Sequence, residues 1–421
     1  QSDRMHIYTQ YAQKLLDKNL AYFCFCTDEM ITQKREAALK LGRIPVYDGT
    51  CSKISRQDAE ARIAKGEKAG VRCRASTKDI FLKDLLRDEI TFKAGTVGDF
   101  FIMRSPTDAE QEAGHKMGMP VYNFCCVIDD HLMKMTHVIR GDDHLSNTAR
   151  QLMIYDALEF PRPQFAHIAM VLGSDKQKLS KRNGDTSLHD YLEKGYLPHA
   201  MANFMALLGW WPPQELKPAS GHPEILSIDE LTKYFDTDGM QKSAAVFDMQ
   251  KLHWMNAFYI RMLPAEQIAN MSKRFFESHS DSELSRAMKE LTQQQFVDLI
   301  DVVRGEATLL SDLPNAASMF LSHRIDLSAE EMKVLKEPSA SQVINEFQKM
   351  IESHGVAISE SDVKSFQKEV GARTNAKGKS LFMPIRVSIT GRMHGPELTK
   401  VIPLLGKEKV LKRIQHVKGL A

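Results

Sequence analysis

Val138-Ile139-Arg140-Gly141-Asp142-Asp143-His144 is a short apolar strand that ends in a polar turn. A helix is predicted directly after it, from Asn147 to Leu158, with apolar residues at 149, 152, 153 and 157. Strand, polar turn and helix in this order form the pattern of an α/β fold. Binding sites in such folds lie at the carboxyl ends of the strands, so we expect a site around Arg140.

The stretch before this unit extends the predicted sheet. Val121 to Ile128 is an apolar run typical of a buried parallel strand, and Asp129-Asp130-His131 follows it. Further strand-like pieces lie at 70–75 and 97–103, and the polar segment from Arg104 to Met119 is interpreted as an inserted loop.

A second polar loop, Lys178-Leu179-Ser180-Lys181-Arg182, follows an apolar run and a glycine turn at Gly173. Two lysines three residues apart can place ammonium groups on a polyphosphate, where they stabilise the charge of a departing phosphate. Taken alone, such a run is more often solvated surface.

Arg140 and its neighbours suggest the chemistry of the site. A guanidinium can bind a carboxylate through two parallel hydrogen bonds, and the carboxylates of Asp142 and Asp143 can bind ribose hydroxyls. A surface turn with local ion pairs is the alternative for each cluster. Three polar clusters, at 129–131, 140–144 and 178–182, all follow predicted strands of one α/β unit. Because such strand ends gather at one edge of a sheet, we favour a site for an anionic small molecule and a nucleotide.

Size and composition exclude several classes. The 421 residues, 43% of them hydrophobic, suffice for roughly three domains. No apolar span of roughly 18 residues and no secretory signal is visible, so we expect no membrane partner. Six cysteines without a secretory context favour a reducing compartment, and we expect a cytoplasmic protein.

The carboxyl-terminal part has a helical apolar spacing from about residue 225 and is basic at its end. The whole chain has a net charge of only +2, but segment 368–421 has twelve lysines and arginines against three acidic residues. Such a module is typical of a contact with a phosphate backbone. A solvated basic helix is an equally weighted alternative.

Cys24, Cys26 and Cys51 are candidate soft ligands for Zn²⁺, and Tyr47 lies four residues before the last of them. A structural zinc site usually has four cysteine or histidine ligands, and no histidine is nearby. Lys53 cannot bind a metal while it is protonated. The spacing alone therefore favours free cysteines without a metal.

Taken in order, these pieces closely resemble a bacterial-type glutamyl-tRNA synthetase of class I. The resemblance covers nearly the whole chain and depends on many short motifs. They are Gln1–Arg4, Val127–Met133, Val138–Thr148, Lys178–Arg182, Gly184–Leu188, Gly195–Pro198, Ala206–Trp210, Val246–Asn256 and Leu404–Glu408. The resemblance implies an α/β, Rossmann-like nucleotide-binding fold, incomplete at its N-terminus, followed by an all-α anticodon-binding region. It also implies ATP-dependent activation of glutamate and its transfer to the 3′-terminal adenosine of tRNA(Glu).

The resemblance assigns roles at the nucleotide site. Lys178 and Lys181 match the two lysines of the family's mobile phosphate loop, where they would neutralise the departing pyrophosphate. Ser180, Asp142 and Asp143 would complete the ATP site. ATP with Mg²⁺ is the implied nucleotide.

The resemblance also assigns glutamate, metal and tRNA contacts. Arg140 matches the arginine that holds the glutamate side-chain carboxylate, Tyr122 matches a tyrosine of that pocket, and Cys126 stands where some members have an asparagine. Zinc-binding relatives match Cys24, Cys26 and Cys51, with Tyr47 as the remaining candidate ligand for Zn²⁺ because Lys53 replaces a histidine. The segment 391–396 matches a stretch near the anticodon bases, which makes three residues candidates for tRNA binding: Arg392, Gly395 and Pro396.

The implied layout has four parts. Residues 1–119 would be the connective domain that binds the acceptor end, and 120–165 the second half of the Rossmann-like catalytic domain. Residues 166–260 would be the phosphate-loop and stem-contact region, and 261–421 the anticodon-binding domain. The implied partners are glutamate and tRNA(Glu), with tRNA(Gln) left open as a second tRNA, and the implied state is a monomer.

The chain starts at Gln1, and the family's H-x-G-H signature and first nucleotide-binding strand are not in it. We therefore expect an N-terminally truncated synthetase. This form alone is expected not to make glutamyl-adenylate, which pyrophosphate exchange would test.

Three alternatives compete with this interpretation. A tRNA-modifying paralogue that transfers glutamate to a modified base normally lacks the anticodon domain, and the long helical region after Asn256 argues against it. Glutaminyl-tRNA synthetase is the second alternative, but its C-terminal part is β-rich, whereas the C-terminal part of this chain has a helical spacing. The alternative from another class is a non-catalytic tRNA-binding fragment, but such a binder would not need the lysines of a pyrophosphate loop.

Overall fold

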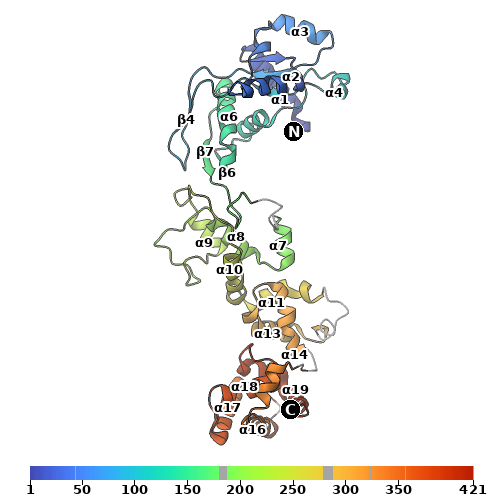
Figure 1. Cartoon of the computed structure of the whole chain (residues 1–421), viewed down its shortest axis with the longest axis vertical. Coiled ribbons are helices and arrows are strands. Elements are labelled where there is room, and N and C mark those ends of the chain that lie inside the picture. Colours follow the sequence, from blue (N-terminus) through green and yellow to red (C-terminus); the bar gives the residue numbers. More distant parts are fainter. Residues whose placement is uncertain are drawn as a thin grey trace. The chain divides into compact units, whose positions relative to one another are not determined.

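The computed structural model of the chain describes residues 1–42, 44–179, 187–277, 288–321, 325, 327–355 and 357–420. The chain divides into two compact units (Figure 1). Unit 1 comprises residues 1–172, 209–212 and 235–245, and unit 2 comprises residues 173–208, 213–234 and 246–421. Among the described residues, no helix combines the length and apolarity that a membrane span requires.

The first part of unit 1 is a small α/β region built on an antiparallel sheet. Its elements are η1 (Ser2–Arg4), α1 (Met5–Asp17), β1 (Ala21–Cys24), α2 (Asp28–Lys40), η2 (Thr50–Lys53), α3 (Arg56–Ala64), β2 (Gly70–Cys73), β3 (Ile80–Leu82), β4 (Ile90–Phe92), β5 (Phe100–Met103) and α4 (Asp108–Glu112). The sheet has the order β1-β2-β5, and β3 pairs with β4 in a separate hairpin. Helix α1 contacts β1 and buries Tyr8, Ala12, Leu15 and Leu16, which share one helix face.

The second part of unit 1 positions Arg140. Its elements are α5 (Tyr122–Leu132), β6 (His137–Gly141), η3 (Asp142–His144), α6 (Leu145–Ala157) and β7 (Gln164–Ile168). Strands β6 and β7 are parallel, with Arg140 opposite His167. Helices α5 and α6 pack against each other. The predicted strand at 138–139 and the helix after it are confirmed, and so are the strands predicted near 70–75 and 97–103.

The prediction of a buried strand over Val121–Ile128 is wrong, because these residues begin helix α5. The buried positions are 124, 125, 127 and 128, which lie on one helix face, whereas Tyr122 is exposed. A short apolar run is compatible with either element, and here contacts of α5 with α1, α6 and β5 stabilise the helix. The segment interpreted as a loop, 104–119, contains the short helix α4.

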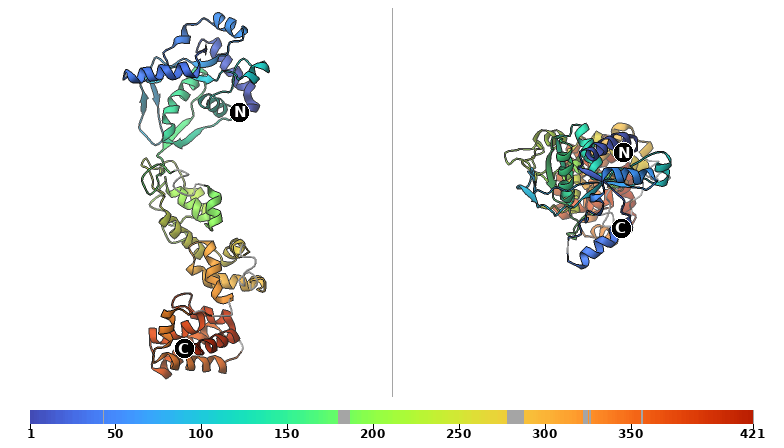
Figure 2. Two further views of the ribbon diagram at one scale, coloured as in Figure 1. Left: turned by 45° about the vertical axis from the view of Figure 1, so that its right-hand side comes forward. Right: turned by 90° about the horizontal axis from the view of Figure 1, so that it is seen from above.

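Unit 2 is helical in its described residues, which confirms the helical spacing read from residue 225 onward. Its elements are α7 (Leu188–Lys194), α8 (Pro198–Leu207), α9 (Ile228–Tyr234), α10 (Met249–Met262), α11 (Ala265–Glu277), α13 (Gln293–Val303), η5 (Arg304–Glu306), η6 (Leu310–Asp312), α14 (Leu313–Leu321), α15 (Ala329–Leu335), α16 (Ala340–Ser353), α17 (Glu360–Thr374), α18 (Lys379–Thr390) and α19 (Leu398–Lys418). One hydrophobic core runs through this unit. Helices α16 to α19 pack on one another in a bundle, drawn in orange to red in Figure 2.

Candidate functional site

Arg140 lies at the carboxyl end of β6, and neighbouring elements hold its guanidinium. Its Nη2 atom donates to Thr148 Oγ1 and to Gln151 Oε1, both at 2.7 Å. Its Nε atom lies 3.4 Å from Nε2 of His167. Thr148 and Gln151 are buried on α6, so two buried side chains restrain the half-buried guanidinium.

His167 connects Arg140 to the carboxylate of Asp84, which no local sequence pattern predicts. Its Nδ1 atom lies 2.6 Å from Asp84 Oδ2, and its Nε2 atom lies 2.9 Å from Thr148 Oγ1. Burial lowers the pKa of His167, although the carboxylate of Asp84 opposes this shift. A neutral imidazole that donates from Nδ1 to Asp84 presents an acceptor at Nε2, which suits the donors of Arg140 and Thr148.

Tyr122 and Cys126 lie one turn apart on α5 and interact electrostatically with Arg140. Partial burial raises the pKa of Tyr122, although much of its side chain is exposed, and the charge of Arg140 opposes the rise. Cys126 donates from Sγ to Oδ2 of Asp130 at 3.5 Å, and burial raises the pKa of Cys126 to about 12. The thiol therefore stays protonated near neutral pH. The structure brings the three predicted glutamate-site residues together.

The two acidic residues after Arg140 begin the short helix η3. Asp142 makes an ion pair with Arg87, whose Nη2 lies 2.9 Å from Oδ2. An ion pair at this turn is the alternative to ribose binding. The carboxylate of Asp143 lies against Gly141, where a Cβ atom would stand 2.7 Å from Oδ1. A side chain at position 141 would push this carboxylate away.

The lysine loop belongs to unit 2. Lys178 follows a tight turn in which the backbone N–H of Gly173 donates to Gln177 O at 2.8 Å, and Asp175 accepts from the N–H of Gln177 at 2.9 Å. The predicted residues Ser180 and Lys181 lie outside the described residues.

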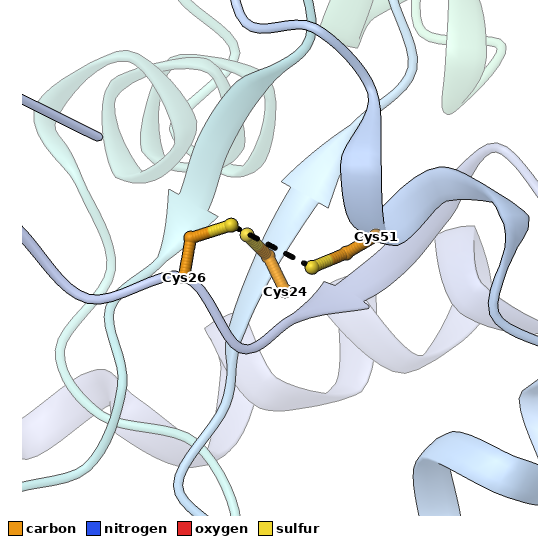
Figure 3. Close-up of side chains that lie close together, drawn as sticks. All are labelled: Cys24, Cys26 and Cys51. Carbon is orange, nitrogen blue, oxygen red and sulfur yellow. Dashed lines mark hydrogen bonds between the residues drawn. The ribbon is translucent and has the colours of Figure 1, made fainter. Parts of the chain in front are cut away.

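The three predicted cysteine ligands converge (Figure 3). Cys24 ends β1, Cys26 follows two residues later, and Cys51 lies on η2; their sulfur atoms all lie within 4.8 Å of one another. The sulfurs of Cys26 and Cys51 are 3.7 Å apart. The hydroxyl of Tyr47 lies 3.5 Å from Cys24 Sγ and 3.3 Å from Cys26 Sγ. All three cysteines are buried.

The thiols of this cluster differ in acidity. Burial raises the pKa of Cys26 to about 11. Burial also opposes ionisation of Cys51, but hydrogen bonds from Tyr47 and from the backbone N–H of Phe25 outweigh it and lower the pKa. Cys51 is therefore more easily ionised than Cys26.

The candidate tRNA-binding residues share the loop between α18 and α19. Gly391 ends α18 with a φ of 67°, a conformation that favours glycine. Arg392 is exposed, and its Nη2 lies 3.4 Å from Ser318 Oγ on α14. The carbonyl of Pro396 accepts from Nη1 of Arg386 at 2.8 Å. Arg386, which anchors the loop, was not predicted from the sequence.

Two family domains account for nearly the whole chain. Residues 1–254 match the domain described as "tRNA synthetases class I (E and Q), catalytic domain". Residues 256–418 match the one described as "Anticodon binding domain".

Individual proteins agree with this match. The chain is 41% identical to a glutamate–tRNA ligase of Natranaerobius thermophilus over 418 residues, which are 98% of this chain and 81% of that relative. It is 37% identical to a glutamate–tRNA ligase of Carboxydothermus hydrogenoformans, covering 99% and 83% of the two chains. It is also similar to the crystal structure of a glutamate tRNA ligase from Elizabethkingia meningosepticum in complex with its amino acid. There the TM-score is 0.80 at 26% identity, with 99% of this chain and 82% of that chain covered.

Proposed function

This chain belongs to the glutamate–tRNA ligase family of class I tRNA synthetases, and we propose that it serves the joining of glutamate to tRNA(Glu), a reaction of two steps. That this form alone makes no glutamyl-adenylate stays a prediction for pyrophosphate exchange. In the first step, the α-carboxylate of glutamate attacks the α-phosphorus of ATP, and the bond to the departing pyrophosphate breaks. In the second step, a hydroxyl of the terminal adenosine attacks the acyl carbon, AMP leaves, and the hydroxyl proton is released. ATP is used with Mg²⁺, as this class of ligase requires.

The restrained guanidinium of Arg140 is the main support for glutamate as the substrate. A carboxylate offers a guanidinium a negative charge and two acceptor oxygens, whereas the carboxamide of glutamine is neutral and has one acceptor oxygen and a donating amide. Both hydrogens of Nη2 are donated to Thr148 and Gln151, so Nη1 is left to donate to a substrate carboxylate, and neutral His167 adds no second positive charge. This arrangement supports a preference for the glutamate side chain, with Tyr122 and Cys126 near the guanidinium.

We assign the remaining reactive contacts by the family's pattern. Lys178 and Lys181 would neutralise the charge that develops on pyrophosphate, and Ser180 would bind ATP beside them. The carboxylates of Asp142 and Asp143 would bind ribose hydroxyls, and Asp142 would then share its oxygens with Arg87.

The tRNA would contact both ends of the chain. We propose that residues 1–119 receive the acceptor end and that 120–165 form the second half of the catalytic domain. Residues 166–260 would provide the phosphate loop and contact the tRNA stem, and 261–421 would read the anticodon. The exposed side chain of Arg392, with Gly395 and Pro396 in the same loop of a basic segment, supports contact with the anticodon arm. Glutamine tRNA is proposed as a second tRNA to test. We propose that the chain acts as a monomer in the cytoplasm.

We also propose that Cys24, Cys26, Cys51 and Tyr47 hold a structural Zn²⁺. Zinc–sulfur bonds of about 2.3 Å in a tetrahedron place two sulfurs roughly 3.8 Å apart, close to the distance between Cys26 and Cys51. The hydroxyl oxygen of Tyr47 lies within 3.5 Å of two of the sulfurs and would be the fourth ligand of the metal. The metal would tie the end of β1 to η2. Elemental analysis of the purified chain should find about one zinc per chain, and less than about a tenth would end this proposal.

Competition between tRNAs tests the proposed function. The chain is bound to labelled tRNA(Glu) at one fixed salt concentration, and unlabelled tRNA(Glu), tRNA(Gln) and an unrelated tRNA are added in turn. We expect tRNA(Glu) to displace the label at least tenfold better than the unrelated tRNA, a difference of about 1.4 kcal/mol. Equal displacement by all three would contradict the proposal, because contact with the backbone alone carries no sequence information.

A further inference from the structure

Arg72 lies next to the cysteine cluster because of the register of the antiparallel sheet. On strand β2 it pairs with Tyr22 of β1 on one side and with Phe101 of β5 on the other. Residues directly opposite each other share a face of the sheet, and so do residues two apart on one strand. Cys24, Arg72 and Phe101 therefore project from the same face.

Gly70 makes room for this arrangement. It pairs with Cys24, and a Cβ atom at position 70 would stand 2.6 Å from Cε1 of Phe101. The ring of Phe101 thus occupies the space that a side chain at position 70 would need.

The guanidinium of Arg72 is fixed against one cysteine. Its Nε donates to Cys24 Sγ at 3.2 Å, and its Nη1 donates to the carbonyl oxygen of Asp99 at 3.0 Å. The ring centroids of Tyr47 and Phe101 lie 3.9 Å and 3.7 Å from its Cζ. Arg72 is only 5% exposed, so its position is set by neighbours from three segments.

The charge of Arg72 needs a nearby negative partner. A buried cation is costly unless an anion or hydrogen-bond acceptors compensate it. Within the part of the chain that is described, no carboxylate forms an ion pair with Arg72. The carboxylate of Asp99 instead accepts from the hydroxyl of Tyr22 at 2.6 Å and from the N–H of Ala75 at 2.7 Å. The sulfur of Cys24 is therefore the acceptor that could provide the compensating charge.

We propose that Arg72 is the counter-cation of the cysteine cluster and donates a charge-assisted hydrogen bond from Nε to the thiolate of Cys24. This inference rests on the proposed zinc site. A Zn²⁺ ion with three thiolates has a single net negative charge, which the guanidinium neutralises inside a buried site. Arg72 does not touch the metal; it is a positioning residue that makes the thiolate of Cys24 less costly and fixes its direction.

The test compares zinc binding by the whole chain and three variants. Arg72→Gln removes the charge, and Arg72→Lys keeps the charge but loses the planar fork. Arg35→Gln is the matched control, because Arg35 is exposed on α2 and lines the same cavity of about 500 Å³ as Arg72. Each protein is stripped of metal and titrated with Zn²⁺ against a coloured chelator. Co²⁺ is then added in place of zinc to record the thiolate-to-cobalt absorption.

We expect the zinc dissociation constant of Arg72→Gln to be at least tenfold higher than that of the unaltered chain, the lower end of effects for residues that support metal ligands. The dissociation constant of Arg72→Lys should lie between these two, and that of Arg35→Gln should equal that of the unaltered chain. The thiolate-to-cobalt absorption of Arg72→Gln should be weaker than that of the unaltered chain. Unchanged affinity in Arg72→Gln would overturn the inference and leave the zinc site standing. An unaltered chain that binds no zinc would overturn both. If Arg72→Gln does not fold, the zinc affinity of Arg72→Lys is the test. A zinc affinity of Arg72→Lys equal to that of the unaltered chain would then overturn the inference.

Discussion

Nδ1 of His167 lies 2.6 Å from Oδ2 of Asp84, and both side chains are completely buried. Oδ1 of Asp84 also accepts the backbone N–H of Leu86 at 2.9 Å. Since the other nitrogen of His167 faces Arg140 and Thr148, the carboxylate fixes the imidazole that supports the proposed glutamate-binding arginine. The pair joins two segments 83 residues apart in the sequence.

Replacing Asp84 should destabilise unit 1. Asp84→Ala leaves the Nδ1–H of His167 and the N–H of Leu86 without their acceptor in a site closed to water. We expect the free energy of unfolding to fall by about 3 kcal/mol. Urea unfolding measures the loss, with Asp88→Ala as the control because Asp88 is exposed nearby. Equal stabilities of the two variants would show that the buried pair contributes little.

His167 should make the stability depend on pH. Burial lowers its pKa in the folded state below the ordinary value of 6.5, so the unfolded chain binds the proton more readily. The contribution is fully present above pH 6.5 and is lost as the pH falls towards the folded pKa, by at most about 1.4 kcal/mol per pH unit. Urea unfolding between about pH 7.5 and about pH 5.5 should show a smaller decline for His167→Gln than for the unaltered chain. Parallel declines would contradict the assignment.

Removing zinc should loosen the region around the cysteines. If the metal ties β1 to η2, a strong chelator should lower the melting temperature of unit 1, and added Zn²⁺ should restore it. Cys51→Ala should melt at the lower temperature with or without the chelator. A melting temperature that the chelator does not change would contradict a structural role for the metal.

Arg413 should stabilise the C-terminal bundle. It is 2% exposed on α19, and it donates to the carbonyl oxygen of Ile389 on α18 at 2.9 Å and to that of Met319 on α14. Burial lowers the pKa of Arg413 to about 10. Arg413→Met keeps an apolar stem but leaves both carbonyls without this donor, so we expect a loss of about 2–4 kcal/mol in urea unfolding. Lys412→Met, at an exposed position of the same helix, is the control and should cost little.

The strand, turn and helix around Arg140 and the helical C-terminal part could be predicted because each depends on local spacing. The helix at Tyr122–Leu132 was mistaken for a strand because a short apolar run has no period that separates the two. The partnership of Asp84 with His167 could not be predicted, since it arises from the packing of the chain just after β3 against β7.

The cysteine cluster shows the same limit. Three cysteines and a tyrosine could be selected by their chemistry, but their distances depend on how β1 meets η2. Arg72 carried no local signal, because the antiparallel register alone brings it to Cys24.

The most direct test of the central claim is binding of the chain to tRNA(Glu) and to the same tRNA with a substituted anticodon, at one fixed moderate salt concentration. An unrelated tRNA is measured beside them, and Arg392→Gln is the variant. We predict that the anticodon substitution weakens binding at least tenfold, about 1.4 kcal/mol. We also predict that Arg392→Gln narrows the difference between the two forms of tRNA(Glu). Equal, salt-sensitive binding of all three tRNAs would contradict anticodon recognition by residues 261–421, because it would leave only a basic surface.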